Sequence, residues 1–424
     1  MSSYLVRGGN PLQGSVRASG AKNSALKLMV AALLAPGETV LDGAPDIADV
    51  ATMCEVLAGL GAGVSVDEGS MRLEVPETLG EVAPYELVRR MRASIIVLGP
   101  LLSRNGHARV AMPGGCNIGT RKIDLHLAGL ERMGVQFSFE HGYLDARATR
   151  LRGASLALDF PSVGATENLL MAAVTAQGST VLDNAAREPE IVDLARFLKA
   201  MGARIEGEGG SRIEIEGVDA LRAVRYRVMP DRIEAGTFAI GAVLTGGDVT
   251  VEGGRAEHLE MALDKLEEAG AKIDASQSGF RVVGPGRPRG VDVATLPYPG
   301  FPTDLQPQMM VLLSIAEGTS IVSENVFESR FMFVDELNRM GSDIRTESHH
   351  ALVRGVERLS GAPVRATDLR AGAALVLAGL VAEGATEVGD IFHIERGYER
   401  FPDKLRSLGA DLSVVAGNGL DGKP

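Results

Sequence analysis

Residues 191–206 read IVDLARFLKAMGARIE, and this stretch contains the pattern from which the fold can be predicted. Up to Met201 the apolar side chains recur at three- and four-residue spacing, which predicts an amphipathic helix. Gly202 follows, and a glycine directly after a helix is typical of a left-handed C-cap. From Ala203 apolar and polar residues alternate, which predicts a strand. The stretch is therefore interpreted as a helix joined to a strand by a glycine.

The same junction recurs along the chain, in LGAGV, MGVQF, MGARI, AGAKI, MGSDI and LGADL. By subtraction, consecutive junction glycines lie 73, 68, 68, 71 and 68 positions apart. Such a regular period indicates a chain built from repeated supersecondary units. Six units are predicted, marked by Gly61, Gly134, Gly202, Gly270, Gly341 and Gly409.

Each unit combines two kinds of helix with short strands. The first helix is apolar almost all round, as in ENLLMAAVTA at 167–176, so we expect it to be buried. The second is amphipathic and should face water on one side. We therefore predict an α/β (α+β) fold of βαβαββ units around buried helices, three units to a domain. Residues 21–229 should form one domain, and residues 1–20 plus 230–424 the other, to which the first residues add a strand.

Composition and charge argue against several classes of function. The net charge is −12 and the pI about 5.2, so no overall positive field is present to attract a nucleic acid or an anionic membrane. The sequence shows neither a signal peptide nor an apolar run long enough to cross a bilayer. The cysteines, Cys54 and Cys116, form no CxxC pair, and no HExxH occurs. We expect a soluble, cytoplasmic protein without a metal site.

Polar residues recur at corresponding positions of the units. One set falls where the buried helices should begin, and a set of arginines falls where the second helices should begin. If the helices of a domain run parallel, their positive N-terminal ends converge and would bind an anion. The carboxylates Glu234, Asp304 and Asp368 would then lie among cations, suited to proton transfer; for any single residue the alternative is a helix cap or a surface ion pair. The first set is Lys22, Asn23, Arg92, Ser162, Thr166, Glu234, Asp304, Asp368 and Arg370, and the second is Arg121, Arg187, Arg255, Arg330 and Arg396.

The stretch PGGCNIGTR at 113–121 predicts a loop with a reactive thiol. Its glycines favour a loop, and Arg121 would stabilise a thiolate at Cys116. The alternative for Cys116 is an inert small hydrophobic residue, which is what we expect of Cys54 on its amphipathic helix. We also expect residues 111–122 to form a mobile lid.

Nine further stretches occur in a fixed order: GAKNSAL, MRASIIVLGPLL, PGGCNIGTR with IDLH, SVGATEN, NAAREPEIVD, PDRIEAGTF, FPTDLQPQ, VFESRFMFVDEL and ATDLRA. With these stretches the whole chain resembles the UDP-N-acetylglucosamine 1-carboxyvinyltransferases, a branch of the enolpyruvyl transferases. The resemblance implies two inside-out α/β barrel-like domains of three units each, with the active site in the cleft between them. It implies that the 3-hydroxyl of UDP-N-acetylglucosamine adds to C2 of phosphoenolpyruvate, that C3 is protonated, and that phosphate then leaves. This reaction commits the sugar to peptidoglycan synthesis and uses no metal or organic cofactor.

The resemblance also implies roles for single residues. Cys116 matches a loop cysteine that acts as general acid or in product release and is alkylated by fosfomycin, and Asp304 matches a general base beside the reacting hydroxyl. Lys22 and Arg396, with Arg92 and Arg121, match cations that hold phosphoenolpyruvate. The remaining substrate-binding positions are Asn23 at the sugar, Lys122 with Ile123, Asp124 and Leu125 beside the uracil, Ser162, Val163 and Gly164 at the nucleotide, Val326 and Phe327 at the sugar, and Arg330, Asp368, Leu369 and Arg370.

One position departs from the family pattern. The family has proline after the loop arginine, whereas Lys122 stands here, which adds a charge and removes a rigid φ. Three alternatives to the transferase stay open: a 5-enolpyruvylshikimate-3-phosphate synthase, a non-catalytic protein that binds a UDP-sugar, and a redox sensor that uses Cys116. Lys122 supports the second of these, and SVGATEN and PGGCNIGTR speak against the first.

Overall fold

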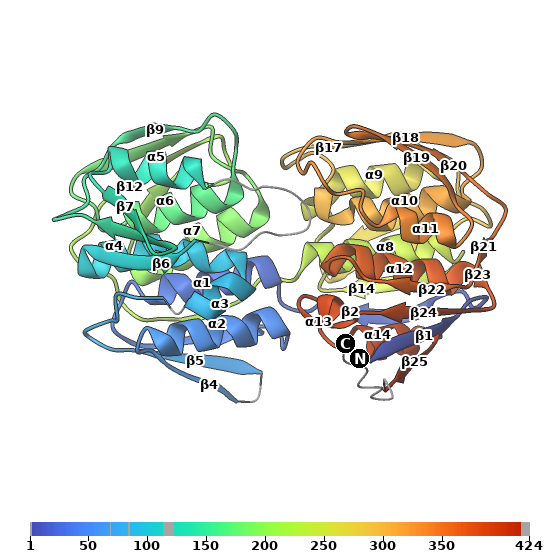
Figure 1. The fold of residues 1–424 in the computed structure, drawn as a ribbon, viewed down its shortest axis with the longest axis horizontal. Helices are drawn as coiled ribbons and strands as arrows, with labels where there is room; N and C mark the ends of the chain where they lie inside the picture. The colour runs from blue at the N-terminus through green and yellow to red at the C-terminus, as the bar shows by residue number, and fades with distance from the viewer. Residues whose placement is uncertain (1, 68, 84, 113–122, 417–424) are drawn as a thin grey trace. The chain divides into compact units, whose positions relative to one another are not determined.

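The computed structural model describes residues 2–67, 69–83, 85–112 and 123–416 (Figure 1). They divide into two compact units, each with its own hydrophobic core. One unit lies between Ser19 and Met229, and the other consists of the chain up to Ala18 and from Pro230 onward. Each unit contains three of the six junction glycines.

The unit from Ser19 to Met229 contains sheets with the strand orders β13-β3-β5-β4, β6-β8-β7 and β11-β12-β10-β9. The strands are β3 (Gly37–Asp42), β4 (Gly63–Asp67), β5 (Ser70–Val75), β6 (His107–Ala111), β7 (Gln136–Glu140), β8 (Tyr143–Arg147), β9 (Ser155–Ala157), β10 (Ser179–Asp183), β11 (Arg204–Glu206), β12 (Arg212–Glu216) and β13 (Arg225–Arg227). The helices are α1 (Lys22–Ala32), α2 (Ala48–Gly59), α3 (Tyr85–Arg90), the 3-10 helix η1 (Arg92–Val97), α4 (Leu98–Asn105), α5 (Asp124–Arg132), α6 (Val163–Ala173) and α7 (Pro189–Met201).

The other unit contains sheets with the orders β15-β16-β14-β2, β17-β18-β20-β19 and β22-β24-β1-β25, and the pair β21-β23. The strands are β1 (Ser3–Arg7), β2 (Gln13–Arg17), β14 (Asp248–Glu252), β15 (Lys272–Ser276), β16 (Gly279–Val283), β17 (Val293–Thr295), β18 (Thr319–Glu324), β19 (Asp343–Glu347), β20 (His350–Arg354), β21 (Leu359–Ser360), β22 (Pro363–Arg365), β23 (Ala382–Glu383), β24 (Ala385–Gly389) and β25 (Asp411–Val415). The helices are α8 (Arg232–Leu244), η2 (Ala256–His258), α9 (Glu260–Glu268), η3 (Thr303–Leu305), α10 (Gln306–Ile315), α11 (Val334–Arg339), α12 (Leu369–Val381), α13 (Phe392–Glu395) and α14 (Phe401–Ser407).

The sheet of β9 to β12 shows how one repeat is built. β9 pairs with β10 in parallel, and β10 pairs antiparallel with β12 of the β11–β12 hairpin. Because α6 connects β9 to β10 and α7 connects β10 to β11, this repeat has the predicted order βαβαββ. The repeat from β17 to β20 has the same order and pairing.

Three sheets take a strand from a distant part of the chain. β13 pairs in parallel with β3, and β2 pairs in parallel with β14. β1 lies between β24 and β25 and is antiparallel to both. The sequence predicted one strand from the first 20 residues, whereas the structure has two, in different sheets.

Burial separates the two kinds of helix, as predicted (Figure 1). Every residue of α8 is buried, and α1 and α12 are buried except at Asn23 and at the two ends of α12. α7 and α9 instead leave one side exposed. The six junction glycines have φ between +91° and +111°, the left-handed region expected of glycine C-caps.

Candidate functional site

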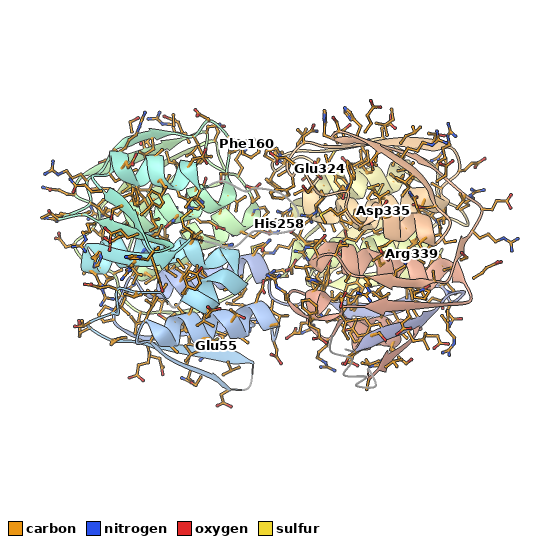
Figure 2. All side chains as sticks on the ribbon, in the orientation of Figure 1. Glu55, Phe160, His258, Glu324, Asp335 and Arg339 are labelled. Atoms are coloured by element: carbon orange, nitrogen blue, oxygen red, sulfur yellow. The ribbon has the colours of Figure 1, made fainter. Side chains whose placement is uncertain are left out.

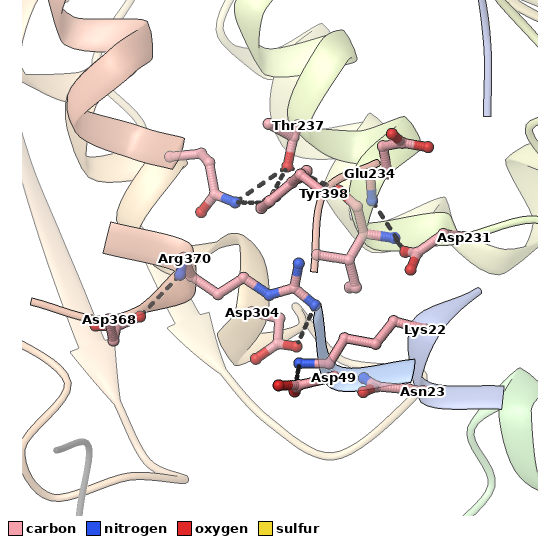
Figure 3. A network of polar contacts seen from close by, with 12 residues as sticks. Lys22, Asn23, Asp49, Asp231, Glu234, Thr237, Asp304, Asp368, Arg370 and Tyr398 are labelled. Atoms are coloured by element: carbon pink, nitrogen blue, oxygen red, sulfur yellow. Dashed lines mark hydrogen bonds and ion pairs between the residues drawn. The ribbon is translucent and has the colours of Figure 1, made fainter. Parts of the chain in front are cut away.

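In the unit from Ser19 to Met229, α1 begins at a buried ion pair (Figure 3). Lys22 Nζ lies 2.7 Å from Asp49 Oδ2. Asp49 belongs to the first turn of α2, so the pair joins the starts of two helices. Ala21, the N-cap of α1, gives the first-turn N–H groups no side-chain acceptor. A helix start with an ammonium group beside it and no capping side chain is suited to an anion, and Asn23 follows in the same turn.

A second polar layer lies one turn further along α1. Lys27 Nζ donates to Asn23 O at 3.0 Å and lies 3.3 Å from Glu167 Oε1 of α6, while Ser24 donates to Asp193 of α7. Burial raises the pKa of Glu167 to about 7, although Lys27 acts in the opposite direction. Burial also raises the pKa of Asp193. These contacts tie α1 to α6 and α7 and so fix the position of Lys22 and Asn23.

The predicted nucleotide contacts gather at the starts of α5 and α6. Ser162 is the N-cap of α6, and its Oγ accepts from Ala165 N at 3.3 Å. Gly164 lies against His126 of α5, since a Cβ at Gly164 would stand 3.3 Å from the imidazole ring. His126 Nδ1 in turn lies 3.1 Å from Asn168 Nδ2. The structure thus brings together the segments of Ile123, Asp124 and Leu125 and of Ser162, Val163 and Gly164.

In the other unit, the carboxylate of Asp304 lies between two arginines. Arg330 Nη2 donates to Asp304 Oδ1 at 3.1 Å, and Arg370 Nη2 donates to Asp304 Oδ2 at 3.0 Å (Figure 3). The arginine side chains are 2% and 4% exposed, whereas that of Asp304 is 24% exposed. Two charge-assisted hydrogen bonds favour an ionised, oriented carboxylate. We expected Arg330 and Arg370 to face an anionic ligand, and the structure shows them holding Asp304.

A buried hydrogen-bond network lies behind Arg370. Tyr398 Oη is 2.9 Å from Thr237 Oγ1 of α8, and Gln308 Nε2 of α10 donates to both oxygens at 3.0 Å (Figure 3). The Arg370 guanidinium lies over the Tyr398 ring, 5.3 Å from its centroid. Burial raises the pKa of Tyr398, so its hydroxyl stays protonated. Burial lowers and Asp304 raises the pKa of Arg370, and the net shift is upward.

One of the three predicted helix-start carboxylates, Asp368, is a helix cap. Asp368 Oδ1 accepts from Arg370 N and Ala371 N at the start of α12. Glu234 differs from expectation more strongly: it is 2% exposed and forms an ion pair with Lys404 of α14 at 2.6 Å. The cap of α8 is Asp231, whose Oδ1 accepts from the N–H groups of residues 233 and 234. Glu234 is thus part of the packing between two helices.

Other predicted substrate-binding residues lie after β18, at α13 and at the starts of α12 and η1. Val326 and Phe327 follow β18, and the Arg330 guanidinium lies 5.7 Å from the centroid of the Phe327 ring. Arg396 is the C-cap of α13, not the start of a helix as expected, and it lowers the pKa of His393 together with burial. Leu369 opens α12 and Arg92 opens η1, but the Arg92 side chain lies outside the described residues, as do Cys116, Arg121, Lys122 and most of the predicted 111–122 lid.

A family model, EPSP synthase (3-phosphoshikimate 1-carboxyvinyltransferase), matches residues 6–405. The UDP-N-acetylglucosamine 1-carboxyvinyltransferase of Corynebacterium jeikeium is 56% identical over 413 residues, which cover 97% of this chain and 99% of that protein. The chain belongs to the UDP-N-acetylglucosamine 1-carboxyvinyltransferase branch of the enolpyruvyl transferases. A second member, UDP-N-acetylglucosamine 1-carboxyvinyltransferase 2 of Carboxydothermus hydrogenoformans, is also 56% identical and covers 98% of this chain and 100% of its own length.

Solved structures of enolpyruvyl transferases share the fold. The enolpyruvyl transferase NikO of Streptomyces tendae superposes with a TM-score of 0.89 at 27% identity, covering 98% of this chain and 99% of NikO. An EPSP synthase of Acinetobacter baumannii has a TM-score of 0.75 at 18% identity, covering 98% of this chain and all of its own, and shows the fold alone. The α/β class and the two-domain organisation predicted from the repeat are therefore those of the enolpyruvyl transferases.

Several residues that contact the candidate site residues were missed from the sequence. The Asp49 carboxylate has a weak signal, because it stands in the first turn of a predicted helix. Gln308 had none, because a buried polar side chain on an apolar helix cannot be told from an exposed one by spacing. Tyr398 had none either, because it lies in the connection between α13 and α14, where no period applies. Within the described residues, no group of His, Cys, Asp and Glu is arranged to hold a metal ion, and none of the helices there is long and apolar enough to span a membrane.

Proposed function

We propose that the protein transfers the enolpyruvyl group of phosphoenolpyruvate to the 3-hydroxyl of UDP-N-acetylglucosamine and releases phosphate. The observation that carries this proposal is the 56% identity, over 97% of the chain, to a relative named for that activity. The geometry supports the roles of single residues, which form part of the same proposal.

Asp304 is the general base. Its two arginine partners favour the ionised form, which is the form able to accept a proton. The sugar 3-hydroxyl gives its proton to Asp304 while its oxygen bonds to C2, and the electron pair of the C2–C3 double bond takes a proton at C3. In the second step C3 loses a proton, the double bond re-forms, and the bond from C2 to the phosphate oxygen breaks.

Cations hold the phosphate and carboxylate of phosphoenolpyruvate through both steps. Lys22, Arg92, Arg121 and Arg396 supply them, and Arg330 and Arg370 add to the positive potential while they orient Asp304. Preorganised cations stabilise charge that develops on the leaving phosphate without reorganisation. The Asp49 carboxylate and the α1 start support this role, since they fix the Lys22 ammonium at a helix start whose N-cap, Ala21, offers no side-chain acceptor.

The nucleotide sugar is bound by the segments around Asn23, residues 123–125, residues 162–164 and residues 326–327, and by the start of α12 at 368–370. Cys116 is the general acid at C3 or assists product release, with residues 111–122 closing over the substrates. If so, Cys116→Asp should retain turnover and lose alkylation by fosfomycin, measured by mass spectrometry. Unchanged labelling of that variant would contradict the assignment.

The decisive experiment measures phosphate release from phosphoenolpyruvate by purified protein without added metal, with UDP-N-acetylglucosamine in one arm and shikimate 3-phosphate in the other. Release only with the nucleotide sugar is expected. Release only with shikimate 3-phosphate would support the activity for which the family model is named. Release with neither would favour a binding protein or a thiol sensor, with Lys122→Pro as the first reversion. In the cell we assign the reaction to the cytoplasm, at the commitment to peptidoglycan synthesis.

A further inference from the structure

The last residue of β18, Glu324, is a buried carboxylate with three hydrogen-bond donors. Its Oε1 accepts from Val326 N at 2.8 Å and from Phe327 N at 2.9 Å, and its Oε2 accepts from Thr303 Oγ1 at 3.0 Å. The residue is 3% exposed, and Figure 2 labels it at the strand end. Burying a carboxylate is costly unless it is hydrogen-bonded, and here both oxygens are.

Corresponding strand ends elsewhere in the repeats are built differently. β3, β10 and β14 end in Asp42, Asp183 and Glu252, which are partly exposed and pair with the arginines Arg225, Arg212 and Arg17. Ser323 is opposite the first residue of β20, as Asp42, Asp183 and Glu252 are opposite the first residues of β5, β12 and β16. β18 therefore runs one residue beyond the corresponding strand ends, and side chains alternate between the faces of a sheet. The outer position therefore falls to Ser323, which bonds to His350, and Glu324 turns inward.

The donors of Glu324 lie in two segments that carry predicted substrate contacts. Thr303 precedes Asp304 in η3, and Val326 and Phe327 are the predicted sugar contacts. Asn325 strengthens the connection, because its N and Nδ2 donate to Thr295 Oγ1 and O at 3.0 and 3.1 Å. The segment before Asp304 and the segment after β18 are thus fastened together.

The contacts form a closed ring around the proposed base. Glu324 holds the N–H of Phe327, and the Phe327 ring lies against the Arg330 guanidinium. Arg330 donates to Asp304, and Thr303, the residue before Asp304, donates through its hydroxyl to Glu324 and so closes the ring. A shift of any one segment would therefore move the others.

We propose that Glu324 is a positioning residue, which sets the Val326–Phe327 segment against Asp304 so that the sugar and its reacting hydroxyl reach the base together. The inference rests on the proposed function. Glu324 itself neither touches substrate nor transfers a proton, so its effect is on binding and orientation of the nucleotide sugar.

Two variants of Glu324 separate positioning from charge. Glu324→Ala removes the acceptor of two N–H groups and of the Thr303 hydroxyl. Glu324→Gln keeps an oxygen for both N–H groups and presents an amide N–H that the Thr303 hydroxyl can accept. Glu252→Ala is the matched control, since it removes a strand-end carboxylate of the same unit that is exposed and pairs with Arg17.

The experiment measures the Kd for UDP-N-acetylglucosamine by calorimetry, KM for each substrate, and the melting temperature. For Glu324→Ala we expect the Kd and KM for the nucleotide sugar to rise about tenfold or more, equivalent to about 1.4 kcal/mol, with KM for phosphoenolpyruvate within about threefold. Glu324→Gln should recover most of the affinity, and Glu252→Ala should match the wild type. If Glu324→Ala fails to fold, Thr303→Val removes one donor at constant shape and should raise the same Kd severalfold.

Three results would overturn the inference. The first is an unchanged Kd for the nucleotide sugar in folded Glu324→Ala or, where that variant fails to fold, in Thr303→Val. The second is an equal rise in both KM values. The third is a Glu324→Gln variant as defective as Glu324→Ala, which would mean that charge matters rather than position. A wild-type protein without activity on UDP-N-acetylglucosamine contradicts the proposed function instead, so the two failures are distinguishable.

Discussion

The buried helices of the two compact units begin with different residue types: a cation or a hydroxyl in one unit and carboxylates in the other. Between Ser19 and Met229, α1 starts with Lys22 and α6 is capped by Ser162. From Pro230 onward the helix starts carry Asp231, Asp304 and Asp368. Two of these carboxylates accept from backbone N–H groups as ordinary caps, whereas Asp304 accepts from two arginines.

The difference between Asp304 and the two caps teaches that a repeated position does not fix a role. Asp304 lies within the 3-10 turn η3, so the N-cap of α10 is Leu305 and the carboxylate is not needed there. Because Asp304 does not cap a helix, its carboxylate can interact with a ligand. The following variants test that comparison, beginning with the largest expected effect.

Asp304→Asn should abolish most of the activity, because an amide cannot accept the proton of the hydroxyl. We expect kcat to fall on the order of 10²–10⁴-fold, the usual contribution of a general base. Phosphate release measures it. The matched control is Asp248→Asn, which changes a surface carboxylate of the same unit paired with Arg281 and should retain wild-type kcat. Comparable kcat in the two variants would show that Asp304 has only a structural role, as the caps Asp231 and Asp368 do.

Lys22→Ala tests the cationic start of α1. It removes a buried cation beside Asp49, so both stability and activity should fall; the expected loss of stability is about 3 kcal/mol. Adding Asp49→Asn removes the buried anion too, and the double variant should regain most of the stability but none of the turnover. Recovery of turnover in the double variant would show that Lys22 serves only to neutralise Asp49.

Glu167→Gln tests the buried polar contacts around Lys27, one turn further along α1 than Lys22. In the folded protein the pKa of Glu167 is raised to about 7, above its value in the unfolded chain, so the folded state holds the proton more tightly. Wild-type stability should therefore decrease as the pH rises from about 4.5 through 7. The variant lacks this titration, so relative to wild type it should gain on the order of 2 kcal/mol between pH 5 and 8. Denaturant unfolding at both pH values measures the difference, and parallel curves for the two proteins would show that burial of Glu167 carries no such cost.

Asp231→Ala should have the smallest effect of the four. Loss of a capping carboxylate costs about 1 kcal/mol, and Asp231→Asn should restore it because Asn caps equally well. Thermal unfolding of both variants provides the measurement. A loss in Asp231→Asn as large as in Asp231→Ala would show that Asp231 acts through its charge, and so resembles Asp304 more than Asp368.

The regular parts of the fold could be predicted because they depend on spacing alone. The junction glycines predicted the repeat and its C-caps, and the all-round apolar character of the first helices predicted the burial of helices such as α8. The partners at the site could not be predicted, because topology brings them together: Arg330 and Arg370 lie 26 and 66 positions from Asp304. The inward turn of Glu324 depends on one extra strand residue, which is within the usual error of a boundary assigned from sequence.

The pairing of β1 with strands from the far end of the chain has a consequence for synthesis on the ribosome. β1 lies between β24 and β25, so Ser3 is opposite Val415, more than four hundred positions away. The unit between Ser19 and Met229 contains all of its own strands, closed by β13 on β3, and can fold as soon as it is made. In the other unit β2 can pair once β14 has been made, but β1 stays unpaired until nearly the whole polypeptide has emerged, because its partners β24 and β25 come last. The chain therefore folds from the inside outward, with the second-made unit closing around the segment that was made first.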